Sequence, residues 1–186
     1  MRLDKNRIIG VDPGTNILGF AIIDYSLSKP KVLTADVLRL KDFELHADKL
    51  REIYLRVQEI IEAYGPAIMS IETPFYGKNP QSMLKLGRAQ GVALTAAVVM
   101  GLDIYEFSPK KIKQSITGNG NASKQQVFDM LEKTTQFKIE VKYLDASDAL
   151  ATALCCYYFL QNPLPTKSGK SSWASFIKEF PDKIKI

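Results

Sequence analysis

The sequence predicts an α/β fold in which helices flank both faces of a five-stranded mixed sheet whose first three strands are antiparallel. Residues 7–40 contain three apolar runs joined by short turns, and short links favour antiparallel hairpins. Helical and strand-like segments then alternate, which is typical of parallel crossovers. A chain of 186 residues with 46% hydrophobic content can bury one sizeable core.

The first three strands are expected at residues 7–12, 18–26 and 31–40, which are rich in apolar and β-branched residues. The Pro13–Gly14 pair lies in the first connection, and Pro30 lies in the second. Proline fixes φ and glycine tolerates turn conformations that other residues avoid, so both are typical of tight turns. We therefore expect two consecutive hairpins.

The middle of the chain alternates between helical and strand periodicity. Apolar residues at helical spacing between Leu45 and Ile61 predict a helix that ends at Gly65–Pro66. A strand is expected at residues 67–72, a second helix at about residues 80–100 and a fifth strand at residues 103–108. Such crossovers can bring the first strand beside the fourth.

The last third is expected to be helical up to a basic tail. A lysine-rich stretch contains a short helix and a Gly/Asn loop, after which Ser123 can cap the next helix. The last core helix is expected from about Ser147 to Leu160. We expect one domain over residues 1–161 and a weakly attached basic tail over residues 162–186.

Two carboxylates close apolar strands that the topology can make neighbours. Asp12 follows the first strand and Glu72 follows the fourth. Neighbouring strands lie roughly 4.8 Å apart, so both side chains can project at one end of the sheet within reach of a common ion. Each also has a simpler explanation, because Asp before Pro-Gly is an ordinary turn residue and a strand-end Glu can be solvated.

Two further acids lie near the start of the last core helix. Asp145 and Asp148 are three residues apart, so they can share one helix face with Cβ atoms roughly 5 to 6 Å apart. Helix capping alone is the alternative. Four converging carboxylates would repel one another unless divalent cations lie between them, and hard oxygen ligands favour Mg²⁺ or Mn²⁺. Two such ions can support phosphodiester hydrolysis, which predicts a metal-dependent nuclease.

Other catalytic chemistries lack the residues that they need. His46 is the single histidine, and its charged neighbours indicate a surface residue. Cys155 and Cys156 are adjacent in a helical pattern, which makes them poor disulfide partners and fits a reducing compartment. A zinc site and a Ser-His-Asp or Cys-His site are therefore disfavoured.

The charge distribution suits a polyanionic partner. The net charge is +5, and residues 108–124 and 76–91 carry basic residues without any acid. Solvated surface is the alternative for each of them. The candidate phosphate contacts are Lys78, Lys85, Arg88, Lys110, Lys113 and Lys124. No signal-type cleavage site and no membrane-length apolar run is present, so a cytoplasmic location is expected.

Four stretches also occur in an order and spacing that resemble a known family: IIGVDPGTNILGFAII, SIETPFYGKNPQSMLKLGRAQGV, FSPKKIKQSITGNGNASKQQV and YLDASDALATALC. They resemble the RuvC family of Holliday-junction resolvases, which has a ribonuclease H-like fold. The resemblance covers roughly residues 8–160. It implies a structure-selective endodeoxyribonuclease that resolves four-way DNA junctions in recombination and repair by paired symmetric nicks.

The resemblance also implies roles for single residues and partners. Its four acidic metal ligands would be Asp12, Glu72, Asp145 and Asp148, holding two Mg²⁺ or Mn²⁺ ions per site. An aromatic residue that intrudes on bases would be Phe75 or its neighbour Tyr76, and the lysines that contact the DNA backbone near the cut would be Lys113 and Lys124. The family is a homodimer that works with the RuvA and RuvB branch-migration proteins.

Three questions stay open on sequence alone. DPGTNILGFAII also resembles the phosphate-binding hairpin of actin-like ATPases and sugar kinases, although no second such hairpin or Gly-rich phosphate loop follows. A non-catalytic scaffold that binds junctions is a second alternative. Gly87 and Gly91, four apart on the second helix, can form either a dimer seam or a tight contact with the sheet.

Overall fold

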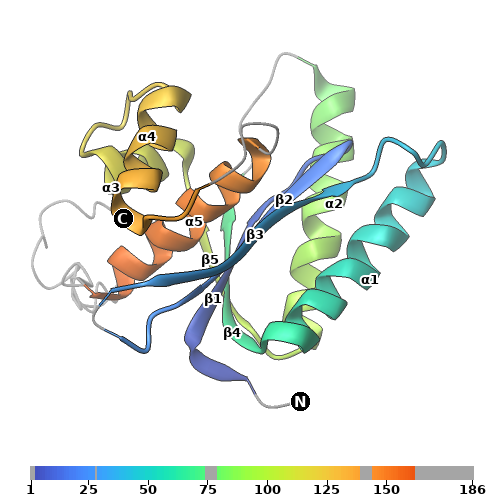
Figure 1. The fold of residues 1–186 in the computed structure, drawn as a ribbon. Coiled ribbons are helices and arrows are strands. Elements are labelled where there is room, and N and C mark those ends of the chain that lie inside the picture. Colours follow the sequence, from blue (N-terminus) through green and yellow to red (C-terminus); the bar gives the residue numbers. More distant parts are fainter. Residues whose placement is uncertain (1–2, 28, 74–78, 139–143, 162–186) are drawn as a thin grey trace, which may run out of the picture.

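The computed structural model describes residues 3–27, 29–73, 79–138 and 144–161. Its elements follow in the order β1 (Asp4–Asp12), β2 (Ile17–Asp24), β3 (Lys31–Arg39), α1 (His46–Tyr64), β4 (Pro66–Glu72), α2 (Pro80–Val99), β5 (Asp103–Phe107), α3 (Pro109–Thr117), α4 (Lys124–Thr135) and α5 (Leu144–Gln161) (Figure 1). The predicted tail over residues 162–186 lies outside the described residues.

The five strands form one mixed sheet in the order β3-β2-β1-β4-β5. Strands β1, β2 and β3 pair antiparallel, whereas β1–β4 and β4–β5 pair parallel. The predicted hairpins and the predicted neighbourhood of the first and fourth strands are thereby confirmed. Val11 pairs with Ile71, so the next residues along, Asp12 and Glu72, lie at the same end of the sheet.

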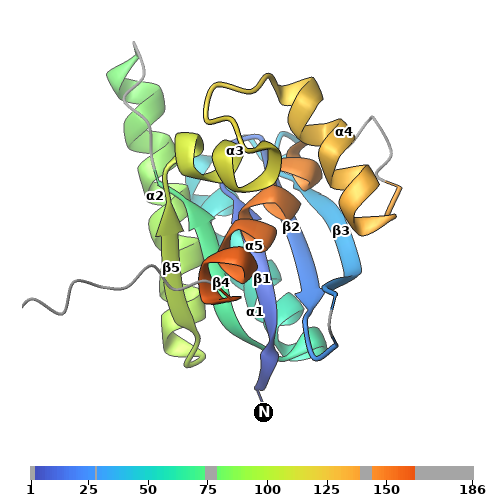
Figure 2. The same cartoon turned by 90° about the vertical axis from the view of Figure 1, so that its left-hand side faces the viewer.

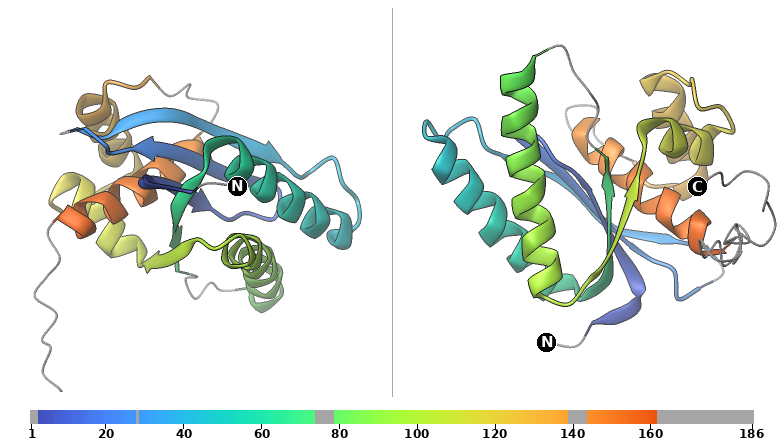
Figure 3. Two further views of the ribbon diagram at one scale, coloured as in Figure 1. Left: turned by 90° about the horizontal axis from the view of Figure 1, so that it is seen from below. Right: turned by 180° about the vertical axis from the view of Figure 1, so that it is seen from behind.

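Helices cover both faces of the sheet, as predicted. Helices α1 and α2 lie on one face, and α5 crosses the other with α3 and α4 beside it (Figures 2 and 3). Successive strand residues point to opposite faces, so Ile8 packs in the α5 core while Ile9 packs in the α1–α2 core. Strand β1 is buried on both sides, which explains why its sequence is a continuous apolar run.

Helix α5 is the most buried helix, and it begins earlier than predicted. It starts at Leu144 rather than near Ser147, so Asp145 lies in its first turn and Asp148 one turn later. Cys155 and Cys156 are buried and free, in agreement with the prediction that they form no disulfide. In the described part of the chain, no helix has the length and apolar character that crossing a membrane requires.

Local signals set the other helix ends where the sequence predicts them. Gly65, in the left-handed region with φ 59°, ends α1. Ser123 caps α4 in a reciprocal capping box with Gln126, so two otherwise unpaired N–H groups are satisfied. This cap fixes where α4 begins, and therefore where Lys124 enters the site described next.

Candidate metal centre and nucleic-acid interface

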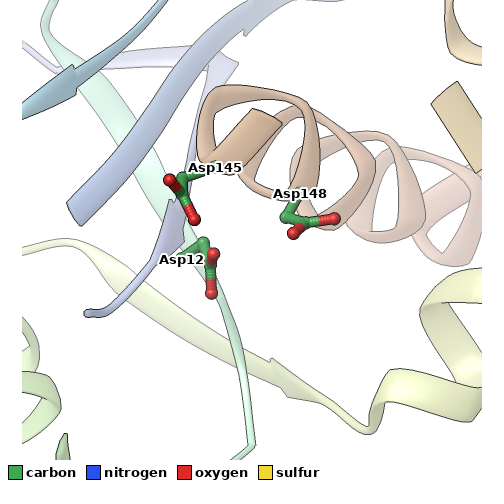
Figure 4. Close-up of side chains that lie close together, drawn as sticks. All are labelled: Asp12, Asp145 and Asp148. Atoms are coloured by element: carbon green, nitrogen blue, oxygen red, sulfur yellow. The ribbon is translucent and has the colours of Figure 1, made fainter. Parts of the chain in front are cut away.

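Three carboxylates from two distant parts of the chain meet at one end of the sheet. Asp12 ends β1, while Asp145 and Asp148 belong to the first two turns of α5 (Figure 4). One carboxylate oxygen from each residue lies within 4.8 Å of the other two. This spacing allows the three oxygens to share a bound cation.

Two strand glycines let α5 approach the sheet closely enough to form this cluster. A Cβ atom on Gly19 would overlap the backbone carbonyl of Asp145, and one on Gly10 would overlap that of Ala149. Gly19 pairs with Asp12 across the β1–β2 hairpin. The absence of a side chain at Gly19 therefore brings the first turn of α5 against the strand pair that carries Asp12.

Asp12 is the most strongly perturbed acid of the cluster. The pKa of its carboxyl is raised from an ordinary 3.8 to about 7, and burial is the largest cause. The charges of the neighbouring acids contribute to this rise after burial, in the order Asp148, Glu72, Asp145. Lys124 acts in the opposite direction but does not compensate. The cluster thus carries a charge that a bound cation would neutralise.

Glu72 lines the same cleft but lies outside the group of three oxygens. Burial, followed by the charge of Asp148, raises the pKa of the Glu72 carboxyl. The backbone carbonyl of Glu72 accepts a hydrogen bond of 3.3 Å from the side-chain amide of Gln90, a buried residue of α2. Gln90 was not among the predicted site residues. A glutamine in an otherwise apolar helix face does indicate a buried polar group that needs a hydrogen-bond partner, so the sequence could have suggested it.

Two lysines complete the cleft on the side of α3 and α4. The cleft measures about 410 Å³, and Lys113 and Lys124 line it together with Asp12, Glu72 and Asp148. Lys124 Nζ donates a hydrogen bond of 2.8 Å to Asp148 Oδ2, and this bond raises the pKa of Lys124. Positive groups thus lie beside the carboxylates, where a DNA phosphate would need them.

The donor set fits a hard divalent cation. Every candidate ligand is a carboxylate oxygen, and no histidine or cysteine belongs to the cluster among the described residues. Oxygen-only sites suit Mg²⁺ or Mn²⁺, whereas zinc favours nitrogen and sulfur. Burial and the neighbouring acids together raise the pKa of Asp12, and the charge of a bound cation would act against both.

The other predicted DNA contacts do not all lie in this cleft. Lys110 is exposed on α3, and Lys85 and Arg88 are exposed on α2. Lys85 lines a different cleft, next to the β1–β2 turn. The remaining predicted contacts lie outside the described residues, namely Phe75, Tyr76 and Lys78.

The two glycines of α2 face away from the sheet. A Cβ atom on Gly87 or Gly91 would meet nothing within 4 Å. Leu84 and Val98 are exposed on the same side of the helix, by 64% and 59%. Tight packing on the sheet therefore does not explain these glycines, and α2 presents an open strip of small and apolar residues.

Comparison with known proteins gives a consistent family match. The family described as crossover junction endodeoxyribonuclease RuvC matches residues 8–156. A curated relative of that description from Cytophaga hutchinsonii is 49% identical over 178 residues, which are 96% of this chain and 88% of the relative.

Solved structures agree with the sequence matches. A Thermus thermophilus RuvC in complex with Holliday junction substrate is 26% identical, covers 84% of this chain and 96% of its own, and has a TM-score of 0.78. The yeast mitochondrial Holliday junction resolvase Ydc2 is 13% identical and covers 97% of this chain and 86% of its own, with a TM-score of 0.66 that supports the fold alone. The predicted resemblance and the ribonuclease H-like fold class are confirmed.

Proposed function

The chain belongs to the RuvC family of crossover junction endodeoxyribonucleases and resolves Holliday junctions, and we propose that Asp12, Asp145, Asp148 and Glu72 form its catalytic metal site. The observation that carries this proposal is the cluster of three carboxylate oxygens within 4.8 Å of one another. The cluster opens into a cleft that also contains Glu72 and two lysines.

The metal is proposed to be Mg²⁺, with Mn²⁺ as a substitute and two ions per site. Asp12, Asp145 and Asp148 would hold the ions, and Glu72 would complete the site from β4. When bound, such ions supply the Lewis acidity that activates a water nucleophile and stabilises the leaving oxygen in phosphodiester hydrolysis. The support is the all-oxygen donor set and the uncompensated charge at Asp12.

The lysines of the cleft are proposed to hold the DNA backbone next to the cut. Lys113 and Lys124 approach from α3 and α4, and the loop between these helices separates them. Their positive charges would bind phosphate oxygens on either side of the reacting bond. Lys110 is proposed as a more peripheral contact, and Phe75, Tyr76 and Lys78 are proposed as contacts near the junction centre.

We also propose that the enzyme works as a homodimer through the exposed face of α2. The strip formed by Leu84, Gly87, Gly91 and Val98 supports this, because it combines exposed apolar side chains with glycines that permit close helix approach. A two-fold dimer would hold two sites at a fixed spacing, as paired nicks on symmetric strands require. Cooperation with the RuvA and RuvB branch-migration proteins is proposed on family membership alone.

Neither alternative from the sequence is favoured. The family match spans residues 8–156 and therefore includes every candidate carboxylate, so the residues for hydrolysis are present. The segment that resembles a phosphate-binding ATPase hairpin is better explained as the β1–β2 hairpin of this nuclease fold.

The deciding experiment is metal-dependent cutting of a synthetic four-way junction. The purified protein should nick a mobile junction in Mg²⁺ at paired positions on two opposite strands and leave a linear duplex of the same sequence intact. Chelation should abolish cutting while gel-shift binding of the junction persists. Cutting that continues in chelator would remove the metal from the mechanism, and unpaired nicks would argue against a symmetric dimer.

A further inference from the structure

A second polar cleft lies beside the β1–β2 turn, separate from the carboxylate cleft. It measures about 240 Å³. Its walls come from three places: Thr15 and Asn16 of the turn, His46 and Lys49 of α1, and Ser82 and Lys85 of α2. Both helices begin at the same end of the molecule (Figure 1). The turn follows Asp12 directly, so the two clefts lie close to the same end of β1.

His46 is unsatisfied in this cleft. Its Nε2 atom is buried and has no hydrogen-bond partner among the described residues. The residue as a whole is half-exposed, in agreement with the predicted surface position, and only its Nε2 atom is covered by neighbouring atoms. A covered polar nitrogen without a partner is unfavourable, so the arrangement favours a ligand that supplies the missing hydrogen-bond partner.

The groups around His46 are mainly positive. Burial lowers the pKa of His46, and the charges of Arg88, Lys85 and Lys49 lower it further in that order. Lys49 is held in place, because its Nζ donates to Asn16 Oδ1 at 3.0 Å and to the Thr15 carbonyl at 3.3 Å. Glu44 is the acid among the lining residues. Among the lining residues, two lysines stand against one carboxylate, and Arg88 lies near enough to lower the pKa of His46, so the cleft has a positive potential.

The start of α1 adds to this potential. Its N-cap residue, Leu45, offers no side-chain hydrogen bond to the first-turn N–H groups. A helix without a side-chain cap leaves its first N–H groups and the positive end of its dipole available to an anion, and Asp48 in the first turn offsets only part of this charge. The uncapped helix, the unpartnered imidazole nitrogen and the cation cluster are independent features, and they converge on one cleft.

We propose that this cleft binds a second backbone phosphate of the DNA substrate, across the β1–β2 turn from the reacting phosphate. The proposal deepens the proposed function and rests on it. A DNA strand that occupies the carboxylate cleft must continue past the turn, and the cleft offers donors suited to phosphate oxygens. His46 would donate through Nε2, beside the ammonium groups of Lys49 and Lys85.

One test uses the single histidine of the chain as a reporter. The imidazole C–H resonances of His46 need no assignment, so they can be followed by NMR against pH in the full-length protein without metal. Addition of an immobile four-way junction should shift these resonances and raise the pKa of His46, because a phosphate favours the protonated ring. A junction that binds in the same sample without moving the resonances would overturn the proposal and leave the nuclease function intact.

A second test measures the number of phosphates bound. Lys85→Gln should flatten the dependence of log K on log salt for junction binding by about 0.9, the amount that one lost phosphate contact removes. The matched control is Lys31→Gln, which removes the same charge from an exposed position at the other end of the sheet and should leave the slope unchanged. Equal salt dependences of junction binding for the two variants would contradict a phosphate site in the His46 cleft.

Inorganic phosphate separates the two possible sources of the anion. Phosphate at millimolar concentration should move the His46 resonances weakly, and the junction should displace it. If phosphate alone reproduced the full shift and the junction failed to compete, the cleft would be a site for a small anion and the proposal would be wrong. Loss of junction binding by the unsubstituted protein would instead contradict the proposed function.

Discussion

Asp145 supplies a carboxylate to the cluster and faces Asp12 from the first turn of α5 (Figure 4). Asp145→Asn keeps the shape of the side chain and removes its charge. We expect nicking in Mg²⁺ to fall by roughly three orders of magnitude, which is the effect of removing one important charge-stabilising group. Junction binding should persist, because the phosphate contacts are unchanged.

The measurement is a single-turnover nicking rate, with gel-shift binding measured in parallel. Asp129→Asn, at an exposed position of α4, is the matched control and should cut normally. Normal cutting by Asp145→Asn would remove this residue from the mechanism.

The raised pKa of Asp12 predicts how the metal-free protein responds to pH. The folded-state pKa is about 7 and the ordinary value is 3.8, so the folded protein binds the proton more tightly than the unfolded chain. Stability should therefore fall as pH rises from about 4 to about 7 and stay low above that range. At about 1.4 kcal/mol for each unit of pKa, the loss is on the order of a few kcal/mol.

Asp12→Asn tests this directly, because the amide does not titrate. In chelator, the variant should unfold at a higher temperature than the unsubstituted protein at pH 8, and the two should be similar at pH 4. Added Mg²⁺ should reverse the order at pH 8, since only the unsubstituted protein has the full cluster. Parallel pH profiles for the two proteins would show that Asp12 carries no such penalty.

The contact between α5 and the β1–β2 hairpin determines where two of the three carboxylates lie. Gly19→Ala would push the first turn of α5 away from the sheet, because the new Cβ overlaps the Asp145 carbonyl. We expect a loss of roughly 1–3 kcal/mol in the free energy of unfolding. Nicking should fall by about 10²-fold, since a displacement of about 1 Å is enough for that loss.

Denaturant unfolding and nicking rates check this prediction together. Gly87→Ala is the matched control for the unfolding measurement alone, because its Cβ meets no atom of the same chain and alanine favours the helix. Its place in the proposed dimer strip excludes it from the nicking comparison. If Gly19→Ala were as stable and active as the unsubstituted protein, α5 would not depend on this glycine for its position.

Local sequence signals predicted most elements of the fold. The capping box at Ser123 and the end of α1 at Gly65 are set by neighbouring residues, so they are readable. The start of α5 was placed too late because its first two residues, Leu144 and Asp145, are at least partly exposed, and the buried pattern begins after them. The rest of the first turn of α5 is buried by its contact with the sheet, and the periodicity of the local sequence does not predict such a contact.

Strand order and helix spacing were enough to predict which carboxylates lie near one another at the site. Placing β1 beside β4 brings Asp12 and Glu72 to one end, and helix spacing brings Asp145 near Asp148. Glu72 lies outside the group of three oxygens. Residue spacing in the sequence does not predict side-chain positions, so it could not exclude Glu72 from this group. The cleft beside His46 is formed by three elements packed together, and no single stretch of sequence encodes it.

The two clefts lie on different sides of the sheet. The carboxylates and Lys113 and Lys124 lie on the side of α3, α4 and α5, whereas the His46 cleft lies on the side of α1 and α2. The β1–β2 turn connects them. This arrangement would let one DNA strand contact both faces of the sheet at one end, which fits a substrate larger than a single duplex arm.

The proposed homodimer makes paired cutting depend on the assembly as well as on each site. Gly91→Lys places a long charged side chain on the exposed strip of α2, where the added Cβ meets no atom of the same chain. Lysine also favours the helix over glycine by up to about 1 kcal/mol, so the fold itself should tolerate the change. We expect the variant to be monomeric in analytical ultracentrifugation, because a buried unpaired charge opposes an apolar interface.

The variant should still nick single strands of a junction in Mg²⁺, because its carboxylates are untouched, but the two cuts should become uncoupled. A supercoiled plasmid with an extruded cruciform reports this, since coupled cuts give linear DNA and uncoupled cuts accumulate nicked circles. Thr134→Lys, on the exposed surface of α4, is the control and should remain dimeric with coupled cuts. Linear DNA forms only when both nicks of one junction are made before the complex dissociates. A Gly91→Lys protein that stayed dimeric and linearised the plasmid normally would show that the partner contacts the chain elsewhere than on α2.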